Sequence, residues 1–133
     1  MRFQRVSGTH GESIAAGTAR GLRFLFRNEL GFETGGPAKP GWSSFSFPPY
    51  WFYDCLTVLD YLHDRQADRD PGAFKAVDLV KARRRRDGRW RLGAKHAGRT
   101  FFDLEGAGEP SRWNTLRAMR VRDWWDGEPI ATV

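Results

Sequence analysis

The sequence predicts an all-α fold, and three features of the chain support this prediction. Four segments place apolar residues at the three- and four-residue spacing of a helix face. Residues that favour helix caps stand before these segments, and glycine or proline lies between them. Alternation of apolar and polar residues, the pattern of a strand, is confined to short stretches. We therefore expect helical hairpins joined by long loops that aromatic residues anchor.

The first helix is expected to run from Thr9 to Leu30. Thr9 and Glu12 have capping-box spacing, and Gly31 follows the last apolar residue as a C-cap. One face holds apolar and small residues: Ile14, Ala15, Thr18, Ala19, Leu22, Leu25, Phe26 and Leu30. A glycine- and proline-rich loop, 35–41, follows it.

The central helix is expected to open at Pro48 and Pro49, since the first turn of a helix tolerates the missing N–H groups of proline. Ser46 is its predicted N-cap. Its apolar face is broad: Trp51, Phe52, Cys55, Leu56, Val58, Leu59, Tyr61 and Leu62. A helix with so little polar surface should lie in the middle of the domain and end near Arg65.

Asp70 and Pro71 mark the start of a third helix, with Asp70 as the cap and Pro71 at the first helical position. Its predicted buried stripe consists of Phe74, Val77, Leu79 and Val80. The helix should end in the arginines at 83–86, before a stop at Asp87 and Gly88.

A connection over 92–110 contains one apolar group, 100–104, which is either a short strand or a tucked loop. Ser111 is the predicted cap of the last helix. Its predicted face consists of Trp113, Leu116, Arg117, Met119, Arg120 and Trp124. Residues 127–133 are expected to form a loose tail.

The bulk composition suits one domain over residues 1–133 with a genuine core, because 40% of the residues are hydrophobic and 14% are aromatic. The formal charge of +6 permits an anionic partner but suits a solvated surface equally well. Cys55 is the one cysteine, which excludes an internal disulfide. We see no secretory signal and no apolar run near the roughly 20 residues that span a bilayer, so a cytoplasmic location is expected.

Three segments resemble proteins of the terpene cyclase and prenyltransferase superfamily, specifically the squalene-cyclase-like proteins. Ser46–Asp54 is similar to a helix start in that family, Asp87–Trp90 to the end of its glutamine–tryptophan repeat, and Gly108–Val121 to its closing helix. The resemblance covers nearly the whole chain. It implies hairpins from the carboxyl end of an α/α toroid, a fragment that would bind or process an isoprenoid-type apolar ligand.

The chain also departs from that family. Arg84 falls near the position of the repeat's glutamine, and the acidic Asp-x-Asp-Asp motif of the cyclases is not matched. The prenyltransferase zinc pair, Asp-x-Cys, is not reproduced because Asp54 and Cys55 are adjacent and point about 100° apart on a helix. We therefore expect neither a metal nor a cofactor, and whether the chain is an enzyme stays open.

Asp54 is the candidate catalytic residue, since a carboxyl group among aromatic rings could serve as an acid toward an apolar substrate. The alternative, which we favour, is a structural tie to a loop N–H or to an arginine such as Arg117. Cys55 with a histidine is a weaker candidate for a metal site than for a buried small hydrophobe.

Trp51 and Trp113 are candidate pocket residues, because aromatic rings stabilise cations and contact apolar ligands. Arg112, Asn114 and Arg117 begin the last helix, where they could bind an anionic group of the ligand. The alternative for these three is pairing with the acidic residues of the preceding loop: Asp103, Glu105 and Glu109.

The arginines at 83–86 favour a helix C-terminus over a nucleic-acid surface, because no groove or stacking platform accompanies them. The sequence suggests two functions. One is the binding or processing of an isoprenoid-type ligand; the other is a non-catalytic interaction module that docks on further hairpins, on a partner chain or on itself.

Overall fold

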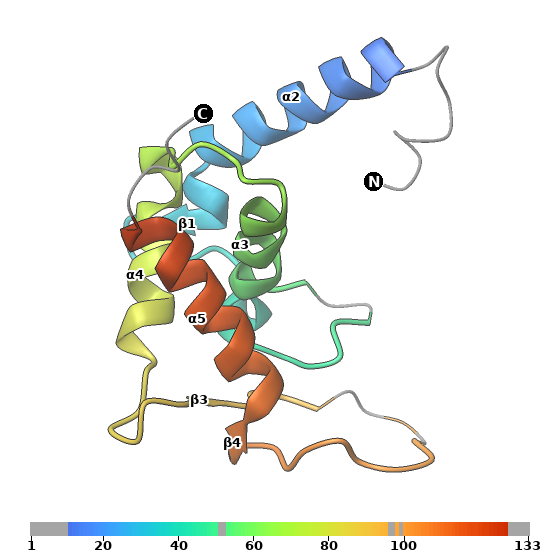
Figure 1. Cartoon of the computed structure of the whole chain (residues 1–133), viewed down its shortest axis with the longest axis vertical. Helices are drawn as coiled ribbons and strands as arrows, with labels where there is room; N and C mark the ends of the chain where they lie inside the picture. Colours follow the sequence, from blue (N-terminus) through green and yellow to red (C-terminus); the bar gives the residue numbers. More distant parts are fainter. Residues whose placement is uncertain (1–10, 51–52, 96–97, 99, 128–133) are drawn as a thin grey trace.

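The computed structural model describes residues 11–50, 53–95, 98 and 100–127. Helix α5 packs across α3 and α4, and α2 extends away from this group (Figure 1). The α-helices are α2 (Gly11–Arg27), α3 (Cys55–Asp64), α4 (Phe74–Ala82) and α5 (Arg112–Asp126). Short 3-10 helices are η1 (Glu29–Gly31), η2 (Pro40–Ser43) and η3 (Pro71–Ala73). Within the described residues, no helix has both the length and the apolar character that crossing a bilayer requires.

The prediction of an all-α chain, built as helical hairpins of an incomplete toroid, is wrong. The structure is 54% helical and also contains two small antiparallel sheets. The strands are β1 (Phe32–Glu33), β2 (Gly36–Pro37), β3 (Trp90–Arg91) and β4 (Pro110–Ser111). Each strand has two residues, so it is too short for an alternating pattern to reveal it. The fold is therefore mixed, and each sheet includes residues of a predicted loop: β2 lies in 35–41, and Pro110 of β4 ends the connection over 92–110.

The second sheet joins the segment after α4 to the start of α5. Trp90 pairs with Ser111 and Arg91 with Pro110, so the long loop between them begins and ends at one place. The Trp90 side chain is fully buried, and its indole N–H donates to the Val80 carbonyl at 2.7 Å. One buried ring thus holds the sheet against α4 and fixes where the loop leaves the body.

Helix α3 begins at Cys55, later than the prolines predicted. Asp54 is its N-cap, with a carboxylate oxygen that accepts from the Thr57 N–H at 2.9 Å. The predicted cap, Ser46, instead donates its backbone N–H to Asp54, and Pro48 follows a cis peptide bond before the helix. The predicted end near Arg65 is confirmed, because Arg65 is the C-cap.

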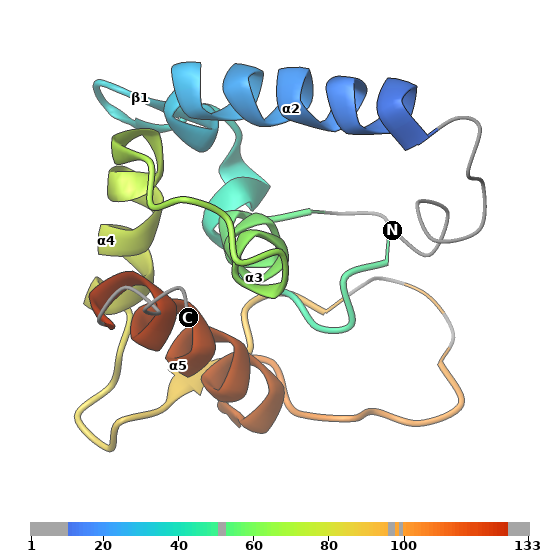
Figure 2. The ribbon, with the colours of Figure 1, turned by 45° about the horizontal axis from the view of Figure 1, so that its top comes forward.

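The core lies between α3, α4 and α5, with α2 along one side (Figure 2). Its buried apolar side chains include Leu56, Leu59 and Leu62 of α3, Ala76, Val77 and Val80 of α4, and Ala118 and Val121 of α5. Cys55 is buried as predicted. The Asp70 cap is also confirmed, since its carboxylate accepts from the Gly72 N–H ahead of α4. Phe74, however, is 56% exposed, so its predicted place in the buried stripe of this helix is wrong.

The face that the last helix turns to the core agrees with the predicted one at Arg117 and Trp124 and differs from it elsewhere. Ser111 caps it as expected, accepting from the Asn114 N–H at 3.0 Å. Its buried residues are Asn114, Arg117, Ala118 and Val121, whereas Trp113, Leu116 and Met119 are between 41% and 52% exposed. The helix therefore buries polar side chains and exposes apolar ones, which points to interactions on both sides. Of the predicted tail, 128–133 lies outside the described residues.

Candidate functional site

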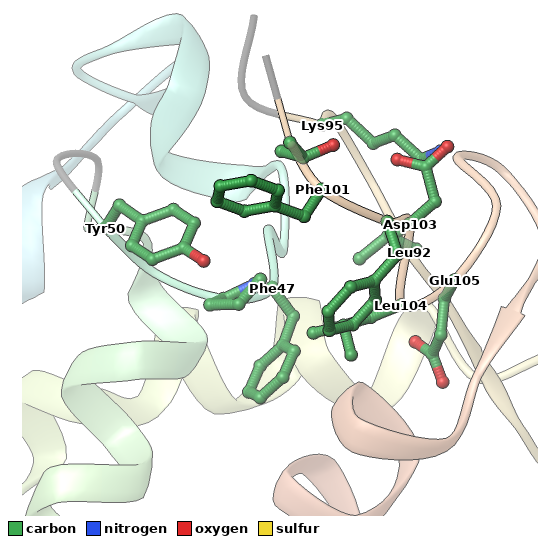
Figure 3. A pocket seen from close by; sticks show the side chains of 11 residues that line it. Phe47, Tyr50, Leu92, Lys95, Phe101, Asp103, Leu104 and Glu105 are labelled. Atoms are coloured by element: carbon green, nitrogen blue, oxygen red, sulfur yellow. The ribbon is translucent and has the colours of Figure 1, made fainter. Parts of the chain in front are cut away.

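A pocket of about 420 Å³ opens where the segment before α3 meets the loop before β4 (Figure 3). Its apolar lining comes from both segments: Phe47, Pro48, Tyr50, Leu92, Phe101, Phe102 and Leu104. Polar side chains at its edge are those of Lys95, Thr100, Asp103 and Glu105. A volume of several hundred Å³ and an apolar lining with few polar groups are typical of small-molecule sites. This pocket is the candidate site.

The loop wall of the pocket, 100–105, belongs to a longer connection whose two ends pair at its base. The Leu92 N–H donates to the Glu109 carbonyl at 2.9 Å, which extends the β3–β4 pairing toward the loop. An ion pair of 3.0 Å joins Lys95 to Asp103 on the rim. The Phe101 side chain is fully exposed, and Figure 3 shows its ring beside that of Tyr50. The apolar group at 100–104 is thus a loop and not a strand, but its apolar side chains are exposed, so it is not the tucked loop that the sequence offered as an alternative.

Glu105 is the one carboxylate in this lining that is almost completely buried. Its side chain is 8% exposed. The Oε1 atom accepts from the Arg112 N–H at 2.7 Å, at the first residue of α5, and lies 3.8 Å from the Arg112 guanidinium. The Oε2 atom is buried and has no hydrogen-bond partner among the described residues. Buried carboxylate oxygens normally have partners, so this oxygen is an unsatisfied acceptor beside the start of α5.

Of the two predicted pocket tryptophans, Trp113 lies against a pocket residue. Its ring stacks on that of Phe47, with centroids 5.2 Å apart and planes 11° from parallel. Trp113 is 42% exposed and is not itself in the lining. Trp51 lies outside the described residues. The structure thus gives Trp113 a supporting contact to the pocket through Phe47.

Asp54, the predicted catalytic acid, is 2% exposed and lies outside the pocket lining. Its carboxylate accepts from the Ser46 N–H at 2.8 Å, from the Thr57 N–H and from the Thr57 hydroxyl. These are the contacts of a helix cap that also ties the preceding loop, as the structural alternative required. A catalytic role for Asp54 stays an untested prediction.

The three residues predicted to bind an anion are divided between the surface and the core. Arg112 is exposed and pairs with Glu105. Asn114 is fully buried, and its amide donates to the Phe45 carbonyl at 2.6 Å and the Arg91 carbonyl at 3.1 Å. These contacts join the pre-α3 segment, β3 and α5, so the structure gives Asn114 a structural role.

Arg117 is also buried, and it contacts polar side chains of α3 and α5. It donates to the Thr57 hydroxyl at 2.8 Å and to the Asn114 side chain at 3.3 Å, and it forms an ion pair with Asp60 at 3.5 Å. Since Thr57 in turn donates to Asp54, a continuous polar network links α3 to α5. The predicted tie between Asp54 and Arg117 therefore exists, but through a hydroxyl group.

Cys55 has the chemistry of a buried hydrophobe. Burial, and then the neighbouring Asp54 charge, raise the pKa of its thiol to about 12. The thiol stays protonated at neutral pH and is a poor nucleophile or metal ligand.

Among the residues that the structure describes, one group of metal-ligating side chains lies together that the sequence did not suggest: Asp60, His63 and Asp64 of α3. Their ligand atoms lie within 4.8 Å of one another. However, Arg120 donates to Asp64 and lies 3.7 Å from Asp60 Oδ1, so a side-chain cation already neutralises this group. We therefore do not propose a metal site at these three residues.

The arginines at 83–86 follow α4, whose C-cap is Arg83. The Arg83 guanidinium lies over the Phe45 ring at 5.2 Å, and that of Arg84 over the Trp90 ring at 5.9 Å. Such contacts attach cationic side chains to the protein's own surface. They agree with the interpretation of this run as a helix terminus.

Sequence reasoning missed Glu105 as a site residue and considered it only as a partner for the polar residues that begin the last helix: Arg112, Asn114 and Arg117. The available signal was its place directly after an apolar group, Phe101–Leu104, in a polar connection.

Comparison with protein-family models, with curated proteins and with solved structures gave no match to the chain.

Proposed function

We propose that the chain binds an apolar ligand of the isoprenoid type in the pocket between the pre-α3 segment and the loop 100–105. The observation that carries this proposal is the lining itself, in which aromatic and aliphatic side chains from two segments surround one open space. Burial of an apolar chain against such surfaces stabilises binding by about 25 cal/mol per Å² removed from water. Binding, rather than turnover, is what this arrangement favours.

The resemblance to the terpene cyclase and prenyltransferase superfamily agrees with an apolar ligand and itself stays a prediction. No cofactor enters the proposal. The cytoplasm remains the proposed compartment, for which the argument is the single cysteine in the sequence.

Farnesol titration with intrinsic fluorescence tests the proposal. We expect a saturable change that is largely lost in Trp113→Phe, because the Trp113 ring stacks on pocket residue Phe47. Phe101→Ser should weaken farnesol binding about tenfold, since it removes a fully exposed pocket ring at little cost to the fold. The matched control is Phe74→Ser, an exposed phenylalanine on α4 outside this pocket. Absence of saturation, or equal affinity in Phe101→Ser and wild type, would contradict the proposal.

A second function, self-association as an interaction module, is favoured by the exposed apolar row of α5. Trp113, Leu116 and Met119 lie three residues apart, so they are neighbours on one side of the helix. An antiparallel α5 pair centred between Leu116 and Met119 would place Arg112 of one copy opposite Asp123 of the other. Both charged side chains are well exposed, at 86% and 67%. The row is thus self-complementary in charge as well as apolar.

A dilution series followed by light scattering tests self-association. We expect the wild-type mass to rise with concentration, and Leu116→Lys to remain monomeric because it places a charge in the centre of the apolar row. Phe24→Lys, which changes an exposed apolar residue of α2, serves as the control and should associate like wild type. A wild-type monomer at every concentration would exclude this function.

A further inference from the structure

We propose that three arginines of α2 form a second site, which binds the di- or triphosphate group of a small molecule. Arg20, Arg23 and Arg27 line an open cavity of about 590 Å³. The rest of its lining consists of Phe24, Phe26 and Asp70. This cavity shares no residue with the apolar pocket before α3, so the inference does not depend on the proposed function.

The three arginines form one exposed row on α2. Their spacing of three and four residues places them on the same side of the helix, and each of the three is exposed. At 1.5 Å per residue, the row extends over about 10 Å of the helix axis. Helix α2 lies along the edge of the molecule (Figure 2), and none of its residues is buried. A ligand can therefore reach the row directly from solvent.

The guanidinium groups of this row have no partner within the described part of the chain. No ion pair or side-chain hydrogen bond joins any of the three to another described residue. Glu29, which follows the row in the sequence, is already paired with Lys75. Like charges three or four residues apart on a helix repel each other. A multivalent anion would replace this repulsion with attraction to all three groups.

The lining favours a polyphosphate over a monovalent anion. Asp70 is its one acidic residue, and one carboxylate oxygen accepts from the Gly72 N–H at 2.7 Å. Three positive charges thus face one negative charge. The planar guanidinium group donates two parallel hydrogen bonds to phosphate oxygens, which makes arginine well suited to phosphate. Because the row extends over two helix turns, it matches two or three linked phosphates better than a single one.

The cavity also favours a small molecule over a flat lipid surface. Its walls come from two segments, since Asp70 precedes η3 and η3 packs against α2. Phe24 is 67% exposed in the same lining, so it offers an apolar contact to an organic group attached to the phosphates. The phosphate chain is the recognised chemistry, and either a free polyphosphate or a nucleotide supplies it.

Calorimetric titration of the full chain with orthophosphate, pyrophosphate and tripolyphosphate tests the inference. Salt is held at roughly 0.1 M, where exposed charges more than about 10 Å apart are largely screened. Tripolyphosphate should bind at least about tenfold more tightly than orthophosphate. Arg23→Gln, at the centre of the row, should weaken tripolyphosphate binding about tenfold, as expected for lost hydrogen bonds to a charged group. Tighter binding of adenosine triphosphate than of tripolyphosphate would identify a nucleotide as the source, and equal binding a free polyphosphate.

Arg86→Gln is the matched control, because it makes the same change of charge at an exposed arginine outside this cavity. It should bind tripolyphosphate as wild type does. An equal loss in Arg86→Gln, or equal binding of orthophosphate and tripolyphosphate by wild type, would overturn the inference. So would binding to phosphatidylglycerol vesicles that depends on Arg23 without any binding of tripolyphosphate, since it would assign the row to a lipid surface. Farnesol binding should be unchanged in Arg23→Gln, so the two sites are tested independently.

Discussion

Gly93→Ala is expected to cost on the order of 4 kcal/mol of the free energy of unfolding or to prevent folding altogether. A Cβ atom on Gly93 would lie 1.4 Å from the Ser44 carbonyl oxygen, a backbone atom that no side-chain rotation can move away. The Gly93 N–H also donates to the Phe45 carbonyl at 3.1 Å, and the Ala94 N–H to the Ser44 hydroxyl at the same distance. Two chain segments are thus in direct backbone contact, and any side chain would force them apart.

Chemical denaturation of Gly93→Ala beside Gly21→Ala measures this effect. Gly21 lies in α2 with nothing within 4 Å of its Cβ position, so alanine there should stabilise the protein by about 0.5–1 kcal/mol. A variant at Gly93 whose stability is within 1 kcal/mol of wild type would show that the two segments do not approach each other so closely. Since both segments lead into the pocket, Gly93→Ala should also abolish ligand binding.

The parts of the fold that the sequence predicted well are those that depend on neighbouring residues. Asp70 and Ser111 each cap the helical segment that follows them, because a cap needs only its own side chain and an N–H two or three residues ahead. The predicted start of α3 was wrong for a related reason. The two prolines strongly indicated a helix start. The actual cap is Asp54, which accepts from the Thr57 N–H three residues later, and its place in a run of aromatic residues made it hard to recognise as a cap.

The face of α5 could not be predicted from residue types. Its inward side carries Asn114, which lay outside the predicted face, together with Arg117, which lay on it. They are buried because distant groups satisfy them: Asn114 by the Phe45 and Arg91 carbonyls, and Arg117 by Thr57 and Asp60. These partners are up to 69 residues away in sequence. The polar network is therefore a property of the tertiary fold, and no local spacing contains it.

The candidate site was predictable in kind but not in place. Aromatic residues suggested an apolar pocket, and Trp113 does contact its lining through Phe47. The lining itself comes from a loop whose conformation the sequence left open, and Glu105 enters it because Arg112, at the start of α5, holds its carboxylate. The sequence could not single out Glu105, because the burial of a carboxylate and its missing hydrogen-bond partner are known only from the tertiary structure.

Asp54→Ala should reduce the free energy of unfolding by about 3 kcal/mol, the sum of a lost helix cap and of buried donors left without acceptors. Three donors lose their acceptor in this variant: the N–H groups of Ser46 and Thr57 and the Thr57 hydroxyl. The Thr57 hydroxyl is also the group that accepts from Arg117, so the loss should extend to the contact between α3 and α5. Asp78→Ala, at an exposed aspartate of α4, is the control and should change stability by no more than about 0.5 kcal/mol.

Asp54→Asn separates this structural role from the catalytic one. Asparagine keeps one oxygen that can cap α3, so its loss of stability should be smaller than that of alanine. Because Asp54 lies outside the pocket lining, the folded asparagine variant should bind farnesol as wild type does. Denaturation midpoints and farnesol titrations on the same preparations give both quantities. Wild-type stability in Asp54→Ala would refute the cap, whereas lost farnesol binding in a stable Asp54→Asn would place this carboxylate at the ligand after all.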